Sequence, residues 1–351
     1  MTCACYLAKA GLKVLVLERY HEVGGMTLTE ELTLPGFRSD VHASGYQLAN
    51  LSPVPGELEL EKHGLELIEP DLVYAHAFPD GRVLAVSRSL EKTVENIGRY
   101  SKKDAETWRA LVERYRAAKG KIVASLFSPP PAFSAEAAAL EQSSAGMEDY
   151  RFGLQSMRSW CDQTFESEEV KCLFGAFALF MAHAPDDAGG AELAWLFGTV
   201  LQDAGNNLVK GGMHHVSPTL ADEGKHLKKF VVLGVPYEIR GDATGHVRER
   251  VWDAAKEGYA DYLIDRITAD YIPDLKEKLL KREAHSPLDL ERKLSSAVHG
   301  TICHGAMLPY QTGSMRPIPE MGDYRSPVEN VYLCGSGSHP GGRRLRRSSP
   351  I

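Results

Sequence analysis

The apolar run LKVLVL at residues 12–17 constrains the fold of this chain more than any other feature. A strand that is apolar at nearly every position is buried on both faces, which is typical of a parallel sheet covered by helices. The residues before the run fit one face of a short helix, and Gly11 stands where a helix commonly ends in the left-handed conformation. Glu18 follows the run directly. The order of helix, tight turn, buried strand and acidic residue predicts an α/β fold.

This order is that of the second half of a dinucleotide-binding βαβ unit. In such a unit the acidic residue bonds the ribose hydroxyls and lies roughly 20 residues after the glycine-rich turn. Counting back from Glu18 places that turn before Met1, so we expect an incomplete unit that lacks its first strand and glycine loop. The pair Gly24-Gly25 alone predicts an ordinary turn. Its place soon after a ribose-type glutamate favours a close approach of backbone to a ligand.

Composition limits the partners and the compartment. Lys and Arg number 40 against 47 Asp and Glu, a net charge of −7 with no sustained basic stripe, which argues against nucleic acid as the main partner. Six scattered cysteines without a CxxC pair argue against a disulfide-framed secreted domain and a zinc site. No apolar run is long enough for a transmembrane segment, and no signal peptide is evident. We therefore expect no metal, and a chain that is cytoplasmic in a bacterium or in the mitochondrial matrix of a eukaryote, and not secreted.

The middle of the chain predicts a hairpin followed by helices. Residues 74–78 and 83–86 flank the turn sequence PDGR at 79–82 and predict a β-hairpin. Ser101 followed by Asp104 is typical of a helix N-cap and its capping-box partner. A long helix is therefore expected to begin after residue 101.

Apolar periodicity places further elements. Ser167 opens a helix that is so apolar over 172–181 that it must be buried or line an apolar cavity. Phe174, Phe177 and Phe180 share one of its faces, and we expect core packing there rather than a lipid channel. Other expected elements are a helix from 210 onward with Pro218 inside it, a strand at 230–233, a helix over 252–280 interrupted by Pro273, and a strand at 331–334.

Two features have structural interpretations. Adjacent residues on a helix point about 100° apart, so His214 and His215 are not expected to share a metal ion. The last nine residues, 343–351, carry four arginines and predict a solvated basic tail. Peripheral membrane contact by this tail is the alternative.

Four segments, in this order, resemble the phytoene-desaturase-like FAD-dependent oxidoreductases: KAGLKVLVLERYHEVGGMT, LVKGGMHHVS, HGAMLPYQTGSMRPIP and NVYLCGSGSHPGG. Within that group the chain is most similar to the pyridine nucleotide-disulphide oxidoreductase domain-containing, or phytoene dehydrogenase-related, proteins. The resemblance runs through most of residues 1–342. It implies a discontinuous Rossmann-like FAD-binding lobe from residues 1–50 and 300–342, and a mixed α+β substrate lobe with a helical insert from residues 51–299.

The resemblance also implies roles for particular residues. Those implied to approach the adenosine, pyrophosphate or flavin near the first strand are Glu18 at the ribose, Arg19 at the adenine, and Gly24, Gly25 and Thr27. Those implied to form the carboxy-terminal flavin loop are Gly335, Gly337, Pro340 and Gly341. Those implied to face the flavin or the substrate are His304, Gln311 and Arg316. For His304 an ordinary loop histidine is the competing interpretation.

The implied activity is dehydrogenation or desaturation of an apolar or amphipathic small molecule, with a hydride passing to FAD. The cofactor supplies that chemistry, so no nucleophilic side chain is required. Compared with the family, the first glycine loop, a stretch between residues 221 and 228, and a glycine-rich helix start after residue 342 are missing. Because glycine loops at helix starts hold pyrophosphates, we expect weak FAD binding or none. A non-catalytic homologue or regulatory binding protein is therefore the alternative.

Overall fold

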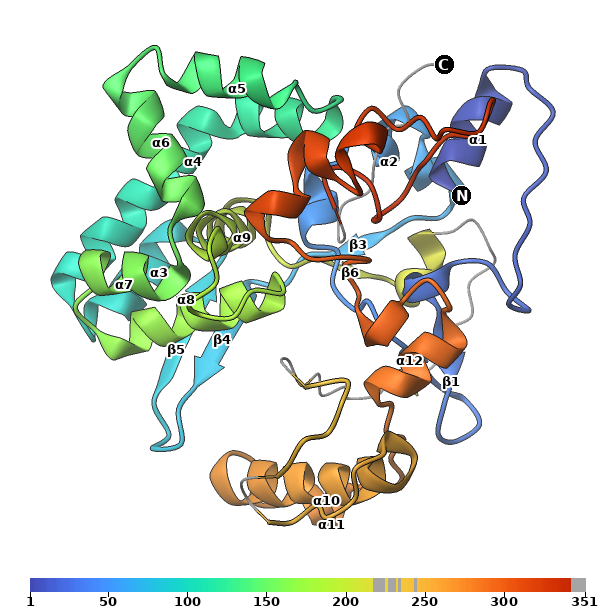
Figure 1. Cartoon of the computed structure of the whole chain (residues 1–351). Coiled ribbons are helices and arrows are strands. Elements are labelled where there is room, and N and C mark those ends of the chain that lie inside the picture. Colours follow the sequence, from blue (N-terminus) through green and yellow to red (C-terminus); the bar gives the residue numbers. More distant parts are fainter. Residues whose placement is uncertain (217–224, 227–231, 233–234, 243–244, 342–351) are drawn as a thin grey trace.

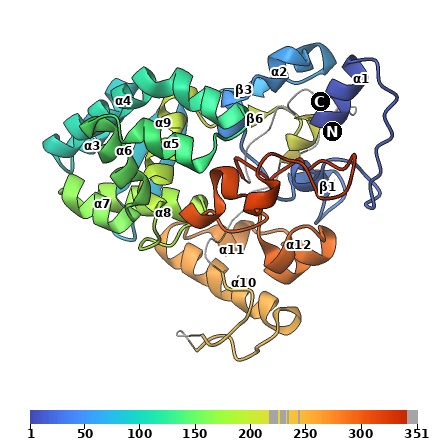
Figure 2. The same cartoon turned by 45° about the horizontal axis from the view of Figure 1, so that its top comes forward.

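The computed structural model describes residues 1–216, 225–226, 232, 235–242 and 245–341. Figure 1 shows the helices of residues 90–204 gathered on one side, with short strands and the C-terminal loops on the other. After rotation by 45°, Figure 2 shows the same division, with a separate helical piece from residues 252–278 below. The expected strand at 230–233, apart from residue 232, lies outside the described residues, as do Pro218 and the basic tail.

The helical side surrounds one large apolar core. Its helices are α3 (Leu90–Gly98), α4 (Lys102–Phe127), α5 (Phe133–Leu140), α6 (Ser144–Leu154), α7 (Met157–Thr164), α8 (Glu168–Phe180) and α9 (Gly190–Ala204). Phe174 and Phe177 of α8 are fully buried in this core, and Phe180 packs at its margin. The expectation of core packing for these three rings is confirmed. Helices α8 and α9 approach closely at Gly198, where a Cβ atom would lie 2.8 Å from the Phe177 ring.

The predicted hairpin is confirmed as the antiparallel pair β4 (Leu72–Ala77) and β5 (Val83–Ser87). The N-cap at the start of α4 is also confirmed, because the Ser101 hydroxyl accepts a hydrogen bond from the Asp104 backbone N–H at 3.1 Å. The capping-box role of Asp104 was wrong. Its carboxylate, fully buried, accepts from the Glu166 N–H at 2.9 Å and from the Ser167 N–H and hydroxyl at 2.8 and 2.7 Å. It therefore joins the start of α4 to the segment that opens α8.

The remaining described strands are short. β1 (Thr29–Glu31) pairs with β2 (Phe37–Asp40) antiparallel, β2 pairs with β7 (Lys225–His226) parallel, and β3 (Leu67–Ile68) pairs with β6 (Leu208–Val209). The helix expected from residue 210 onward is, within the described part, a single 3-10 turn at Met213–Val216. The glycines before it, Gly211 and Gly212, have φ of +78° and +108°, values that break a helix.

The two strands expected at 12–17 and 331–334 were wrong. α1 (Thr2–Lys9) forms as expected and Gly11 follows it at φ +85°, but residues 12–17 have no regular secondary structure. Leu15 and Leu17 are 82% and 85% exposed. At the other end, Tyr332 makes only an isolated bridge with Arg325. A strand needs a neighbour for its backbone groups, and the described residues form no sheet beside either segment.

A polar seam connects the helical side to the rest of the chain. It consists of Asn50, Arg88 and Asn207, together with the turn at Gly205. The Asn207 amide donates to Asn50 Oδ1 at 3.2 Å and its oxygen accepts from the Arg88 guanidinium. The Asn50 amide donates to the Gly205 carbonyl at 3.3 Å. Gly205 has φ +79°, and a Cβ atom there would lie 2.7 Å from Arg88 Nη2, so only glycine fits.

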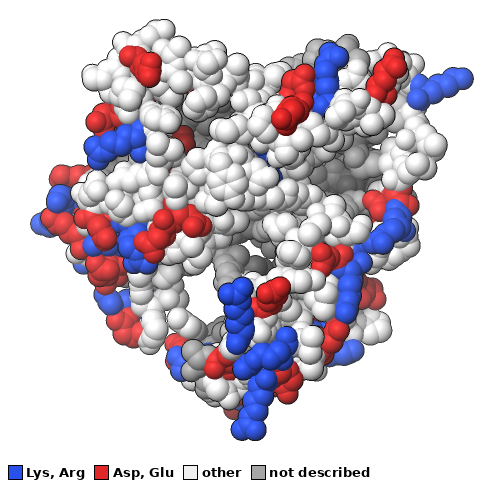
Figure 3. All heavy atoms as spheres, viewed as in Figure 1, with Lys and Arg blue, Asp and Glu red and all other residues white. Residues whose placement is uncertain are grey.

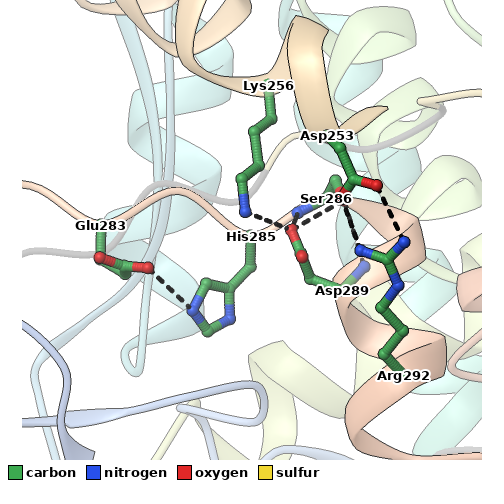
Figure 4. A network of polar contacts seen from close by, with 7 residues as sticks. All are labelled: Asp253, Lys256, Glu283, His285, Ser286, Asp289 and Arg292. Carbon is green, nitrogen blue, oxygen red and sulfur yellow. Dashed lines mark hydrogen bonds and ion pairs between the residues drawn. The ribbon is translucent and has the colours of Figure 1, made fainter. Parts of the chain in front are cut away.

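The helix expected over 252–280 is confirmed with its interruption, as α10 (Trp252–Asp270) and α11 (Leu275–Lys278) on either side of Pro273. The two remaining described α-helices are α2 (Val54–Glu57) and α12 (Pro287–Lys293). α12 begins with a full capping box between Ser286 and Asp289. Figure 4 shows Asp289 also accepting from Lys256 of α10 at 3.0 Å, and Arg292 paired with Asp253. These contacts attach α12 to α10.

Charges of both signs are interspersed over the surface. On the face drawn in Figure 3, Lys and Arg alternate with Asp and Glu along the left and lower margins, and the centre carries few charges. Most ion pairs join exposed side chains, such as Lys92 with Asp71 at 2.8 Å. Such pairs contribute little to stability because water screens them.

We expect Asp104→Ala to destabilise the fold strongly. The substitution leaves three partly buried donors at residues 166 and 167 without their acceptor, which costs about 3 kcal/mol of unfolding free energy. Urea denaturation followed by circular dichroism measures this loss. The exposed control Asp71→Ala should change the unfolding free energy by less than about 1 kcal/mol. Equal losses in the two variants would contradict the assignment of Asp104 as a structural anchor.

Candidate functional site

The residues implied by the sequence fall into two groups in the structure. One is the glycine-turn group of residues 18–27. The other, which we call the C-terminal loop cluster, consists of residues 303–317 and 335–341. Each group makes its main polar contacts with different parts of the chain, as described below.

Arg316 is the centre of the C-terminal loop cluster. It is 1% exposed and donates four hydrogen bonds, all to backbone carbonyl oxygens. Nη1 bonds Ala306 O at 2.7 Å and Gln311 O at 3.1 Å, and Nη2 bonds Cys303 O at 2.6 Å and Ser336 O at 2.9 Å. Burial lowers the pKa of the guanidinium from its ordinary value, and that value is so high that the charge persists at neutral pH. Arg316 therefore ties the two halves of the cluster together.

The other predicted residues of this cluster surround Arg316. The Gln311 side chain accepts from the Ala306 N–H at 2.9 Å. A Cβ atom on Gly341 would lie 2.8 Å from Met307 Sδ, so glycine is required at that close approach. Pro340 is buried beside it. The structure thus brings Gln311, Arg316, Pro340 and Gly341 into one packed unit.

The glycines at the outer end of the cluster face open space. Gly335 has φ +95°, and a Cβ atom on either Gly335 or Gly337 would meet no atom within 4 Å. The Ser338 N–H and hydroxyl both bond back to the Gly335 carbonyl, at 3.3 and 3.1 Å, which closes the turn. The loop is therefore open at Gly335 and Gly337, while Ser338 between this turn and Pro340 is buried.

His304 lies in the same cluster. Its backbone has φ +53°, and its imidazole is partly withdrawn from water. Burial lowers the pKa of His304, and the charge of Arg316 lowers it further. The ring is therefore uncharged at neutral pH, and it can accept or donate a hydrogen bond without carrying a net charge.

The glycine-turn group forms a tight turn. Gly24 and Gly25 have φ of +132° and +56°, and the Thr27 N–H and hydroxyl both donate to the Gly24 carbonyl, at 3.0 and 2.9 Å. Positive φ explains the glycines at both positions. A polar depression of about 420 Å³ opens next to this turn, lined by His21, Glu22, Thr29, Glu30, Glu31 and Arg38.

Glu18 and Arg19 lie on the exposed stretch before the turn. The Glu18 carboxylate accepts from the Tyr20 backbone N–H at 2.9 Å, two residues along the chain. The Arg19 guanidinium reaches the carbonyls of Arg292 and Lys293, each at 3.5 Å. The structure therefore joins Arg19 to α12 rather than to the C-terminal loop cluster, and the ribose and adenine roles of the two residues stay predictions.

A buried network beside the glycine turn was not found by sequence reasoning. Asp40 accepts from the Thr29 hydroxyl at 2.6 Å and from the Met213 N–H at 2.8 Å, and Thr29 in turn accepts from the His214 N–H at 3.0 Å. A Cβ atom on Gly212 would lie 2.5 Å from the Thr29 hydroxyl. The second glycine pair, at 211–212, was the available signal, because it permits this close approach.

Helix α1 and the segment around residue 334 meet at a pair of cysteines. Partial removal from water raises the pKa of the Cys334 thiol, and the nearby Cys3 thiol raises it further, while the Met1 amino group lowers it. Figure 1 shows the C-terminal segment beside α1. The segments 1–50 and 300–342 therefore touch at this point. Their assignment to one cofactor lobe stays a prediction.

The described residues offer neither a metal centre nor a membrane span. In the part of the chain that the structure describes, no group of three or more His, Cys, Asp and Glu side chains is arranged to hold a metal ion. No described helix combines the length and the apolar character needed to cross a membrane.

Comparison with known proteins identifies the family. The family model described as flavin containing amine oxidoreductase matches residues 1–264, three quarters of the chain. The chain belongs to this family. Its mixture of helices and strands agrees with the α/β class expected from the sequence, and FAD is the cofactor that the family implies.

Individual relatives support the resemblance seen in the motifs. One of the subunits of limonene dehydrogenase from Castellaniella defragrans is 31% identical over 229 residues, 64% of this chain and 40% of that protein. Pyridine nucleotide-disulfide oxidoreductase domain-containing protein 2 of Rattus norvegicus is 42% identical over 128 residues, 36% of this chain and 20% of that protein. The matched segments thus span less than half of either relative. A putrescine oxidase structure covers 62% of this chain and 44% of its own, at 18% identity and a TM-score of 0.38.

The residues present fit FAD in part. The C-terminal loop cluster supplies open glycine backbone next to a buried cation, and the glycine-turn group supplies two residues with positive φ. Both are features of loops that approach phosphates or a flavin closely. Glu18 is the exception, since its carboxylate accepts from the Tyr20 backbone N–H.

A short thiol cross-linker tests whether α1 and the segment around residue 334 lie together. We expect a bis-maleimide reagent to link Cys3 with Cys334, because Cys3 lies close enough to affect the Cys334 thiol. Mass spectrometry of the digested protein identifies the linked peptides. Cys172, an exposed cysteine of α8, is the control and should react with one end of the reagent only. Links from Cys172 to Cys3 or Cys334 as frequent as the Cys3–Cys334 link would contradict the contact.

The lowered pKa of His304 makes stability depend on pH. Because the folded-state pKa lies below the ordinary value of about 6.5, protonation favours the unfolded chain. The contribution of the neutral His304 ring to the free energy of unfolding is full above about pH 6.5. It is lost as pH falls below that value toward the folded-state pKa. We expect His304→Asn, which tolerates the positive φ, to reduce the fall of the urea midpoint between pH 7 and pH 5. The exposed control His63→Asn should leave that fall unchanged.

Proposed function

We propose that this chain is part of an FAD-dependent dehydrogenase or desaturase of the phytoene dehydrogenase-related kind, acting on an apolar or amphipathic small molecule. The observation that carries the proposal is the 31% identity over 229 residues to a protein named as a subunit of limonene dehydrogenase. Its name gives limonene, an apolar hydrocarbon, as the substrate of that enzyme. The motifs HGAMLPYQTGSMRPIP and NVYLCGSGSHPGG, which resemble phytoene dehydrogenase-related proteins, agree with this proposal.

The division of labour within the chain follows from its two groups of residues. FAD, when bound, supplies the hydride acceptor, so the protein has to bind, orient and exclude water. We assign cofactor contacts to Gly24 and Gly25 on one side and to Gly335 and Gly337 on the other. The segments 1–50 and 300–342 then form the cofactor lobe, and residues 51–299 form the substrate lobe with its helical insert.

The side chains of His304 and Gln311, in the cluster around Arg316, act through hydrogen bonds. His304 is uncharged at neutral pH and lies in the cluster that holds the flavin loop. A neutral imidazole can hydrogen-bond a flavin or substrate atom without adding a second positive charge beside Arg316. Gln311 holds the loop by accepting from the Ala306 N–H. Neither residue needs to act as a nucleophile.

A second candidate is a non-catalytic homologue with weak or no FAD binding. It is favoured by a specific observation, the Glu18 carboxylate bonded to the Tyr20 N–H instead of facing a cofactor site. The exposed apolar stretch at 12–17 supports it as well, because a cofactor lobe normally buries such a strand.

Titration with FAD separates the two candidates. The dehydrogenase candidate predicts saturable quenching of flavin fluorescence, and about tenfold or greater weakening of FAD binding in Glu18→Ala, because a charged hydrogen bond to the ribose is lost. The control Glu61→Ala, an exposed glutamate of the 3-10 turn at 60–63, should bind as the wild type does. Anaerobic addition of limonene to the loaded protein should then bleach the flavin band. Absence of saturable binding would leave the non-catalytic homologue as the function.

A further inference from the structure

Arg316 is a buried cation whose charge is not balanced by an ion pair in the described part of the chain. Its bonds to Cys303, Ala306, Gln311 and Ser336 all go to carbonyl oxygens, which carry only partial charge. Its fifth donor, Nε, is buried and makes no hydrogen bond. Burying a guanidinium without an ion pair costs free energy of folding. The hydrogen bonds of Arg316 also fix the orientation of the backbone groups that they contact.

The bond to Ser336 fixes the direction of one peptide group. Arg316 Nη2 holds the Ser336 carbonyl oxygen at 2.9 Å. In a trans peptide the C=O and the following N–H point in opposite directions, so the Gly337 N–H points away from the guanidinium. A Cβ atom on Gly337 would meet no atom within 4 Å, so space on this residue is open. Room for a ligand is therefore available beside Gly337.

The same bond makes that N–H a stronger donor. A charged donor bonded to the carbonyl polarises the whole peptide group, and linked hydrogen bonds strengthen one another where water is excluded. The positive charge of Arg316 therefore strengthens the Gly337 N–H as a donor, although the guanidinium itself does not contact the ligand of that N–H. Electron-rich oxygen is the ligand chemistry that such a donor favours.

We propose that Arg316 is a positioning residue that aims and polarises the Gly337 N–H toward an electron-rich oxygen atom of the bound cofactor. This inference rests on the proposed function for the identity of the ligand. It changes the earlier expectation for Arg316, which was to face the flavin or substrate itself. Here Arg316 touches neither and acts through the peptide group between Ser336 and Gly337.

Lysine is a poor substitute for this role. The guanidinium is planar and rigid, and its five donors reach several acceptors at fixed angles, while an ammonium has three donors on a flexible stem. The four carbonyls around Arg316 come from two separate loops, so loss of the fork releases Ser336 from residues 303–311. Arg316→Lys is therefore expected to restore the orientation only in part.

Hydrogen exchange tests the positioning without any cofactor. In Arg316→Gln we expect the amides of residues 335–341 to exchange about tenfold faster or more, because the peptide group is no longer held. Arg316→Lys should show a smaller increase. The control Arg325→Gln removes an exposed arginine whose backbone pairs with Tyr332, three residues before the loop, and should leave the exchange unchanged. Exchange that rises equally in 335–341 and in helix α4, or does not rise in 335–341, would overturn the proposal.

FAD affinity and wild-type protection complete the test. FAD added to the wild-type protein should slow exchange at 335–341, and Arg316→Gln should weaken FAD binding about tenfold, with partial rescue in Arg316→Lys. If both variants fail to fold, the wild-type measurement decides: FAD that binds without protecting 335–341 overturns the proposal. If FAD does not bind the wild type at all, the proposed function fails, and the assignment of a cofactor ligand to Gly337 fails with it. The cofactor-free exchange then still shows whether Arg316 holds the loop.

Discussion

The enclosure of helix α9 is the constraint on which the rest of the structure depends. Most of its residues are buried, so it is stable only when other helices cover it on every side. α8 packs closely because Gly198 leaves room for the Phe177 ring, and the Trp195 indole N–H is satisfied by the Leu111 carbonyl of α4. Near its end, Gln202 accepts from Trp108 and donates to the Ser87 carbonyl of β5. The helix thus fixes both the helical side and the hairpin.

The polar seam after α9 connects this helical core to the candidate site. Asn207 bonds Asn50 and Arg88, and its backbone carbonyl accepts from the Tyr46 N–H at 2.7 Å. From there the chain runs through β6 to the turn at 213–216, which bonds Thr29 and Asp40 beside the glycine turn. Hydrogen bonds at both ends of this stretch therefore connect the buried core with one of the two candidate cofactor segments.

Sequence alone could predict the elements whose signals are local. The hairpin, the Ser101 cap and the apolar helix at 168–180 depend on neighbouring residues, and all three are confirmed. The strand at 12–17 was wrong because a strand also needs a partner, and no pattern within those six residues reports whether one exists. The role of Asp104 was wrong for a related reason, since the backbone donors that its carboxylate accepts from lie 62 and 63 residues away. At the candidate site, the motifs indicated loops that the structure brings together around Arg316, while the hydrogen bond from Arg316 to Ser336 has no signal in the sequence.

Recognition through backbone has a consequence for how these loops can change in evolution. Arg316 bonds only carbonyl oxygens, which every amino acid possesses, so its bonds place no demand on the side chains of Cys303, Ala306 or Ser336. Those positions are free to drift as far as their own packing allows. The arginine has no such freedom, and neither does Gly341, whose missing Cβ leaves room for Met307. Homologous loops can therefore diverge in sequence yet keep one shape, as long as they keep the arginine and the glycine.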